Sequence, residues 1–285
     1  MSTPGPLIFL LGLQRSGTTW LHLQLARTGC FRFVTAADLC AGSTVTATDR
    51  GIDTIPAGPD TPEEYGLVIN PGRLRFEEPD TTETTLPALR ALCDRKARGA
   101  DAGRPLLLKS PPDYPAGVPW LRAAFPSARF VAIQRHPLRT LDSQLRAWRQ
   151  MVLTRLPYLA QIDRAYCAFM DDEPRRLRMG LFLHSPAGVA WLADHILRAH
   201  EGFMALQDDW HDDNLLVVRY EDLCRDQQAG FERLARFLDV CLPAPADAPA
   251  PRLDPVGAEA QAAFDSRRAA FRPFLQRYGY EEDAV

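Results

Sequence analysis

Residues 7–13 of the sequence, LIFLLGL, form an unbroken apolar run that leads directly into a glycine-bounded turn. A run of this kind is typical of a strand that is buried on both faces in a parallel sheet. Residues 18–28 then have the composition of a helix, and Gly29 stands where such a helix would end. The chain is therefore expected to open as strand, loop and helix.

The alternation of strand and helix patterns continues along the chain. Apolar runs predict further strands at residues 105–109, 128–134 and 214–220, and helical patterns occupy residues 86–98, 118–125, 138–151, 153–210, 227–238 and 258–278. Residues 41–85, rich in Thr, Gly, Pro and Asp, predict a long, partly ordered excursion. Together these patterns predict an α/β fold with a central, mostly parallel sheet, flanking helices and a helical insertion.

The chain is expected to form a single domain. Its 285 residues, of which 46% are hydrophobic and 24% charged, are enough for one sizeable core. We divide the domain into a core at residues 7–240, a proline-rich connector at 241–256 and a C-terminal helical segment at 257–285.

Charge and residue usage limit the partners and the compartment. The formal net charge of −3 argues against a nucleic-acid partner. The first apolar run is too short for a membrane span and follows no basic region, so we expect a cytoplasmic protein. Six scattered cysteines favour free thiols, and six dispersed histidines without metal-ligand spacing predict no metal site. The sequence leaves a homodimer open.

The turn after the first strand has the composition of an anion site. In GLQRSGTT, residues 12–19, a glycine-bounded turn meets the start of a helix, whose free N–H groups attract anions. A nucleotide-binding P-loop would need a lysine directly after Gly17, but Thr18 stands there and the cation in the loop is Arg15. A turn without any ligand and a P-loop kinase or NTPase are the alternatives to another phosphate-bearing ligand.

Two more features add to this pattern. Arg135 ends the strand 128–134 and Ser143 follows eight residues later on the next helix, so that guanidinium and hydroxyl can converge on one phosphate. In addition, only two of the 33 basic residues are lysines, Lys96 and Lys109, and Lys109 ends a predicted strand. A lysine that remains in so arginine-rich a chain is a candidate for a specific role.

Four segments together resemble the sulfotransferases that use 3′-phosphoadenylyl sulfate (PAPS), in particular the bacterial and tyrosylprotein-type branch. They are QRSGTTW at 14–20, KSP at 109–111, FPSARFVAIQRHP at 125–137 with Ser143, and RYEDL at 219–223. The resemblance implies a P-loop-like sulfotransferase fold and metal-free, in-line transfer of the sulfuryl group from PAPS to a hydroxyl or, less favoured, an amine. The acceptor would be a small molecule or a peptide, and the released product adenosine 3′,5′-bisphosphate (PAP). A non-catalytic PAP-binding relative is a further alternative.

The resemblance also implies roles for individual residues. Arg15 and Lys109 would be the catalytic cations at the leaving group. The residues expected to bind the donor are Gln14, Arg15, Ser16, Gly17, Thr18 and Thr19 at its 5′ end, Trp20 and Tyr220 beside the adenine, and Arg135, Ser143, Arg267 and Arg268 at the 3′-phosphate.

The general base and the acceptor remain open at the level of sequence. The small-molecule branch carries a histidine two residues after its lysine, where this chain has Pro111. The candidate bases are, in order, Asp38, Glu64 and Asp113, of which Glu64 lies in the excursion. The acceptor pocket is expected from residues 38–75 and 150–190, whose aromatic side chains suggest an apolar acceptor or simply core.

Overall fold

The computed structural model describes residues 5–40, 48–49, 56–69, 85–98, 101, 103–109, 114–243 and 255–280. Within these residues a five-stranded sheet has the order β2-β5-β1-β6-β7, and every pairing in it is parallel. The strands are β1 (Leu7–Leu11), β2 (Arg32–Phe33), β5 (Leu106–Lys109), β6 (Arg129–Gln134) and β7 (Leu215–Arg219). A separate antiparallel pair joins β3 (Thr48–Asp49) to β4 (Pro56–Ala57).

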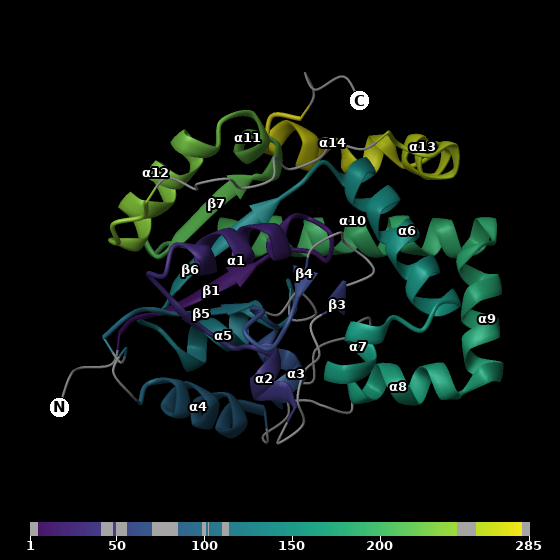
Figure 1. Ribbon diagram of the computed structural model, residues 1–285. Helices are drawn as coiled ribbons and strands as arrows, with labels where there is room; N and C mark the ends of the chain where they lie inside the picture. Colours follow the sequence, from purple (N-terminus) through teal and green to yellow (C-terminus); the bar gives the residue numbers. More distant parts are fainter. Residues whose placement is uncertain are drawn as a thin grey trace.

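Helices cover both faces of this sheet (Figure 1). One face is covered by α1 (Thr18–Arg27), α11 (Tyr220–Arg225) and α12 (Gln227–Leu238). The other carries α3 (Tyr65–Ile69), α4 (Thr85–Lys96), α5 (Val118–Ala124), α6 (Pro137–Leu153), α10 (Pro186–Asp208), α13 (Ala258–Asp265) and α14 (Arg268–Arg277). Beside the sheet, α7 (Pro157–Ile162), α8 (Arg164–Asp171) and α9 (Glu173–Leu183) stand next to α6 as the helical insertion, and α2 (Ala36–Leu39) follows β2.

The position of β1 in the sheet explains why its sequence is continuously apolar. Successive side chains of a strand point to opposite faces of the sheet. Phe9 and Leu11 accordingly enter the apolar cluster under α4, α5 and α10, whereas Ile8 and Leu10 enter the cluster under α1 and α12. Because both faces are covered, all four side chains are buried, and each contributes about 1.5–3 kcal/mol of hydrophobic stabilisation.

The predicted α/β fold is confirmed, and the predicted strands and most helices lie within a few residues of their expected ends. The predicted single helix at 258–278 is wrong, because the chain breaks between α13 and α14. There the Ala263 carbonyl accepts from Ser266 Oγ (2.8 Å) and Arg267 Nη1 (3.3 Å), while the Arg267 N–H donates to the Phe264 carbonyl (2.9 Å). Side-chain donors thus take the acceptor that a continuing helix would use.

The order of the strands places the candidate residues along one edge of the sheet. In parallel strands all carboxyl ends lie on the same side, and ligands bind in the crevice where the strand order reverses. β1 is the central strand, with β5 on one side and β6 on the other. The loop after β1, the end of β5 and the segments after β6 and β7 therefore share this edge.

Two further properties concern the molecule as a whole. All six cysteines are free thiols, as predicted. None of the helices in the described part of the chain combines the length and apolar character that a membrane crossing needs.

Candidate functional site

The loop between β1 and α1 is tightly folded. Gly12, Arg15 and Gly17 have φ angles of 150°, 67° and 101°, and Ser16 Oγ donates to the Leu13 carbonyl over 2.7 Å. A Cβ on Gly17 would lie 2.3 Å from the Tyr220 ring, so only glycine fits there. Gly17 is also the N-cap of α1, and among the described residues no side chain caps the helix N–H groups. The loop therefore presents backbone donors to an anion.

Lys109 brings a buried cation to this loop. Its ammonium donates to Thr19 Oγ1 over 3.0 Å and pairs with Glu64 Oε1 over 3.4 Å, and the lysine side chain is fully buried. A buried ammonium is tolerated only when it is paired, and Glu64 supplies the opposite charge. The structure thus joins two predicted catalytic residues and one predicted donor-binding residue in a single cluster, which we call the lysine cluster (Thr19, Glu64 and Lys109).

A second buried acid stands beside the lysine cluster. Glu63 Oε1 accepts a hydrogen bond of 2.8 Å from the hydroxyl of Tyr158 in α7. The Glu63 N–H donates to the Val34 carbonyl over 2.8 Å, which ties this segment to the residue after β2. Glu64 is therefore carried by a backbone segment that is fixed from two sides.

Arg135 forms the centre of a second cationic cluster. Its Nη1 donates to the Arg15 carbonyl over 2.8 Å, and Arg15 Nε donates to Ser143 Oγ over 3.1 Å. The contact from Arg135 stabilises the left-handed backbone of Arg15, a conformation that costs about 1–2 kcal/mol outside glycine. We call Arg15, Arg135 and Ser143 the arginine cluster. Arg15, predicted as a leaving-group cation, is thereby joined to the predicted 3′-phosphate element.

Arg135 is buried against the ring of Tyr220. Burial lowers the pKa of its guanidinium, an effect that the neighbouring Tyr220 and Glu221 oppose. The guanidinium carbon lies 4.8 Å from the centre of the Tyr220 ring, and Trp20 meets that ring edge-on at 6.4 Å. Among the residues that the structure describes, Arg135 Nε is buried without a hydrogen-bond partner. A buried, unsatisfied guanidinium donor fits an anion.

The remaining candidates have other surroundings. Asp38 forms a capping box with Thr35 at the start of α2 and an ion pair of 2.5 Å with Lys96. Burial alone would raise the pKa of Asp38, but the hydrogen bonds from Lys96 and Thr35 outweigh it and lower the pKa. Asp113 lies outside the described residues.

The two C-terminal arginines are engaged in ion pairs. The guanidinium of Arg267 binds both carboxylate oxygens of Asp194 in α10, and Arg268 pairs with Asp265 over 3.6 Å. Neither contact belongs to the arginine cluster.

Several buried polar contacts near the loop had not been predicted. Gln14 is held by two residues of α6, because Gln144 Nε2 donates to its carbonyl (2.8 Å) and Trp148 Nε1 donates to its Oε1 (3.1 Å). Behind Arg135, Glu221 accepts from the His136 N–H and from the Tyr280 hydroxyl, each over 3.0 Å. A polar residue at helical spacing on an otherwise apolar face, such as Gln144, was the available signal.

The described residues include no group of three or more His, Cys, Asp or Glu side chains arranged to hold a metal ion. The site offers a loop of backbone N–H groups with the Lys109 ammonium at one end and the guanidinium groups of the arginine cluster at the other. Such an arrangement binds an anionic ligand and can stabilise charge that develops on it.

Comparisons with known proteins show the family and the fold. A family model described as "Sulfotransferase family" matches residues 6–243. The fold is similar to sulfotransferase STF9 from Mycobacterium avium, with a TM-score of 0.57, 16% identity, and coverage of 97% of this chain and 77% of that one. It is also similar to a sulfotransferase from Alicyclobacillus acidocaldarius, with a TM-score of 0.50, 16% identity, and coverage of 97% and 94%. The sequence matches no curated protein sequence.

Proposed function

The chain belongs to the sulfotransferase family, whose general chemistry is sulfuryl transfer, and we propose that it moves the sulfuryl group of PAPS to a hydroxyl acceptor. PAP would be the second product. When bound, PAPS supplies a sulfuryl group attached to a phosphate leaving group.

One observation carries the proposal: a basic side chain is held at each end of the loop after β1. Thr19 meets Lys109 on one side, and Arg15 meets Arg135 and Ser143 on the other. A donor with a 5′-phosphosulfate and a separate 3′-phosphate has two anionic ends and matches two clusters. A nucleoside triphosphate has a single phosphate chain and would leave one cluster without a ligand.

We assign the 3′-phosphate to the arginine cluster. The buried Nε of Arg135, unsatisfied among the described residues, is a donor directed at no protein acceptor, and a phosphate oxygen would satisfy it. Trp20 and Tyr220, whose rings stand 6.4 Å apart edge to face, are assigned to the adenine. Since Arg267 and Arg268 are held in their own ion pairs, we do not assign them to the donor.

We assign the 5′ end to the loop residues from Gln14 to Thr19 and to Lys109. The ammonium of Lys109 would neutralise charge that develops on the leaving phosphate, and burial makes that interaction stronger than it would be in water. Thr19 keeps the ammonium in place through the hydrogen bond of 3.0 Å.

Glu64 is our choice for the general base. Its carboxylate lies 3.4 Å from the Lys109 ammonium, in the cluster that also holds Thr19 of the donor loop, so it stands close to the proposed position of the 5′ end, where the acceptor hydroxyl must release its proton. Asp38 is less suited, because its carboxylate caps α2 through Thr35 and pairs with Lys96, and neither partner belongs to the lysine cluster or the arginine cluster.

The assignment of the general base is tested with the Glu64→Gln and Asp38→Asn variants. For each variant, the transfer of labelled sulfate from PAPS to a panel of phenols and alcohols is measured. We expect Glu64→Gln to lower kcat by about 100- to 10,000-fold, the usual contribution of a general base. Asp38→Asn should lose stability through the broken capping box and keep its kcat. PAP affinity should be retained in both variants, which shows that the donor site is intact.

A large loss of kcat in Asp38→Asn, with kcat retained in Glu64→Gln, would instead assign the general base to Asp38. Absence of transfer by the wild-type chain to every acceptor, with PAP still bound, would favour a non-catalytic PAP-binding protein.

A further inference from the structure

The exposed large apolar side chains of the described residues gather in one part of the molecule. They are Leu153 (57% exposed), Leu177 (50%), Leu181 (75%), Phe182 (37%) and Trp191 (37%). Three of them belong to α9, and the other two come from the end of α6 and from the first turns of α10. The ring centres of Phe182 and Trp191 lie 5.8 Å apart. We call these five residues the apolar strip, because a cluster of exposed apolar groups marks an interaction site.

The strip runs across the outer side of α9. A Cβ on Gly180 would lie 3.9 Å from Leu153 Cδ2, so Leu153 stands directly against this helix. An α-helix has 3.6 residues per turn, which places Leu177 and Leu181 between Gly180 and Phe182 around the helix axis. The leucine at the end of α6 is therefore connected to the aromatic end of the strip through the two leucines of α9.

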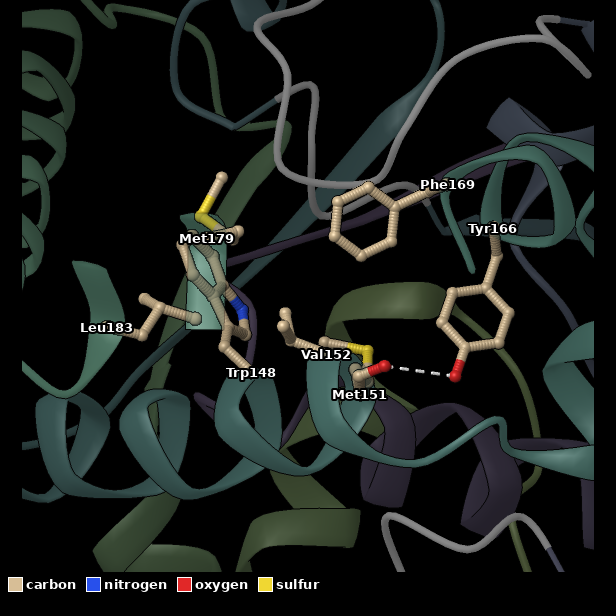
Figure 2. A pocket seen from close by; sticks show the side chains of 7 residues that line it. All are labelled: Trp148, Met151, Val152, Tyr166, Phe169, Met179 and Leu183. Carbon is tan, nitrogen blue, oxygen red and sulfur yellow. Dashed lines mark hydrogen bonds between the residues drawn. The ribbon is translucent and has the colours of Figure 1, made fainter. Parts of the chain in front are cut away.

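Packing against the rest of the chain does not account for the strip. The inner side of α9 carries Met179 and Leu183, which line a small apolar space together with Trp148 of α6 (Figure 2). An amphipathic helix buries one such face and normally exposes polar residues on the other. Leu177 and Leu181 lie on the exposed face, where an apolar side chain gains stability only from a partner outside the chain.

The charges beside the strip are mainly basic. α9 has the sequence EPRRLRMGLFL, with three arginines and a single acid, Glu173, in a chain whose net charge is −3. Arg175 and Arg178 are exposed. The two acids directly before the helix are engaged, since Asp172 caps α9 at the Arg175 N–H and Asp171 is held in an ion pair of 2.5 Å. An anionic partner complements this surface.

A second copy of the chain fits the same surface poorly. In a two-fold dimer the same patch of each copy meets its equivalent. The arginines of one α9 would then meet the arginines of the other, and like charges placed together oppose association. Charge complementarity therefore favours an occupant that is negatively charged.

We propose that the apolar strip docks on the surface of a membrane that contains anionic lipids. Leucine, phenylalanine and tryptophan side chains enter the boundary between headgroups and acyl chains, while arginines bind the anionic headgroups. A lipid boundary is deformable, so it accepts projecting side chains such as Leu181 without a complementary hollow. α9 stands at the outer edge of the molecule in Figure 1, where it can reach a flat surface. The proposal concerns surface binding and does not depend on the proposed function.

Sedimentation of the full chain with lipid vesicles tests the proposal. Vesicles of phosphatidylcholine and phosphatidylglycerol should bind the chain about tenfold or more tightly than vesicles of phosphatidylcholine alone, because the arginines are attracted to the anionic headgroups. Raising the salt concentration from about 0.05 M to about 0.5 M should weaken this binding, since salt screens the attraction.

Variants of the strip separate its apolar and its basic contributions. The double variant Leu177→Ser/Leu181→Ser should bind the anionic vesicles about tenfold or more weakly, because it removes apolar surface that the lipid would bury. Leu181→Met keeps the apolar surface and should bind like wild type. Arg178→Gln should weaken binding about fivefold. Arg233→Gln makes the same change at an exposed arginine of α12, on the other face of the sheet, and should have no effect.

Thermal melting verifies that the variants are folded, and their Tm should stay close to that of wild type because the altered side chains are exposed. Absence of binding to the anionic vesicles, or equal binding by wild type and the double variant, would overturn the proposal. A dimer in the absence of lipid, which the double variant converts to a monomer, would also overturn it and would assign the strip to a second copy of the chain.

Discussion

Gly17 shows how tightly single residues constrain the donor loop. It has a φ angle of 101°, and a Cβ there would meet the Tyr220 ring at 2.3 Å. We expect Gly17→Ala to lower the free energy of unfolding by about 1–3 kcal/mol, through backbone strain and displacement of the ring. Because Tyr220 is assigned to the adenine, the variant should also bind PAP more weakly; urea unfolding and calorimetry measure the two effects.

Gly29 provides the matched control for this substitution. Its φ angle of 69° is also left-handed, but a Cβ there would meet nothing within 4 Å. Gly29→Ala should cost about 1 kcal/mol of stability and leave PAP affinity unchanged. Equal loss of PAP affinity in both variants would contradict the role given to the contact between Gly17 and Tyr220.

At this scale the sequence was informative wherever a residue type was unusual for its position. The loop residues, Lys109, Arg135 and Ser143 were all selected as candidates from local strings, and the structure brings them to one edge of the sheet. The hydrogen bond between Glu63 and Tyr158 joins residues 95 positions apart, and no local pattern announces it. The preference for Glu64 over Asp38 likewise depends on which lysine each carboxylate meets in the folded chain.

Among the elements, α7 contacts the segment that carries Glu64 through the hydrogen bond from Tyr158 to Glu63. We expect Tyr158→Phe to lower stability by about 1–3 kcal/mol, because it removes a hydrogen bond from the buried Glu63 carboxylate. Loosening the segment that carries Glu64 should also lower kcat by about tenfold to a hundredfold. The KM for PAPS should stay close to the wild-type value, and steady-state kinetics with labelled PAPS separate the two parameters.

Tyr278→Phe is the matched control for Tyr158→Phe. It also removes one tyrosine hydroxyl, which donates to Gln207 over 2.6 Å. It should lose stability without a change in kcat. If Tyr158→Phe behaved in the same way, α7 would be a purely structural element.

Elements with strong periodicity were predictable and short or interrupted ones were not. The strands β1, β5, β6 and β7 and the helices α1, α4, α5, α6 and α12 were recognised from their apolar patterns. β2, α2 and α11 were missed, because a strand of two residues or a helix of four to six residues shows too little periodic pattern. The break between α13 and α14 depends on side-chain donors at Ser266 and Arg267, which a periodic pattern does not register.

For the molecule as a whole, we expect the buried His200 to lower the free energy of unfolding in acid. Burial in the core lowers its pKa to about 3, with a smaller contribution from the neighbouring His136. The ordinary value, about 6.5, holds in the unfolded chain, so below it the unfolded chain binds a proton that the folded chain does not. Stability should therefore fall as the pH drops from about 6.5 towards about 3, by up to about 1.4 kcal/mol per pH unit.

Urea unfolding at about pH 7 and about pH 5 measures this effect. His200→Leu should reduce the difference between the two pH values by about 2 kcal/mol, since it removes the titrating group. His211→Leu, at an exposed histidine, should leave the difference unchanged. A wild-type pH dependence that survives in His200→Leu would show that other groups cause it.

The α/β architecture followed from the alternation of strands and helices, but the order of the strands and the packing of the insertion did not. Which helices of the insertion face one another depends on tertiary contacts, such as those of α9 with α6 and α8. The excursion at residues 41–85 supplies Glu63 and Glu64, whose place beside Lys109 and Tyr158 is equally a property of the folded molecule.

Equilibrium binding of PAP to the full chain tests the donor assignment most directly. PAP should bind in the absence of magnesium and raise the Tm, whereas ADP and GTP with magnesium should do neither. Arg135→Ala should weaken PAP binding by about tenfold to a hundredfold, the usual worth of hydrogen bonds to a charged group. Tight binding of ADP or GTP that requires magnesium, together with no binding of PAP, would contradict the assignment of this chain as a PAPS-dependent sulfotransferase.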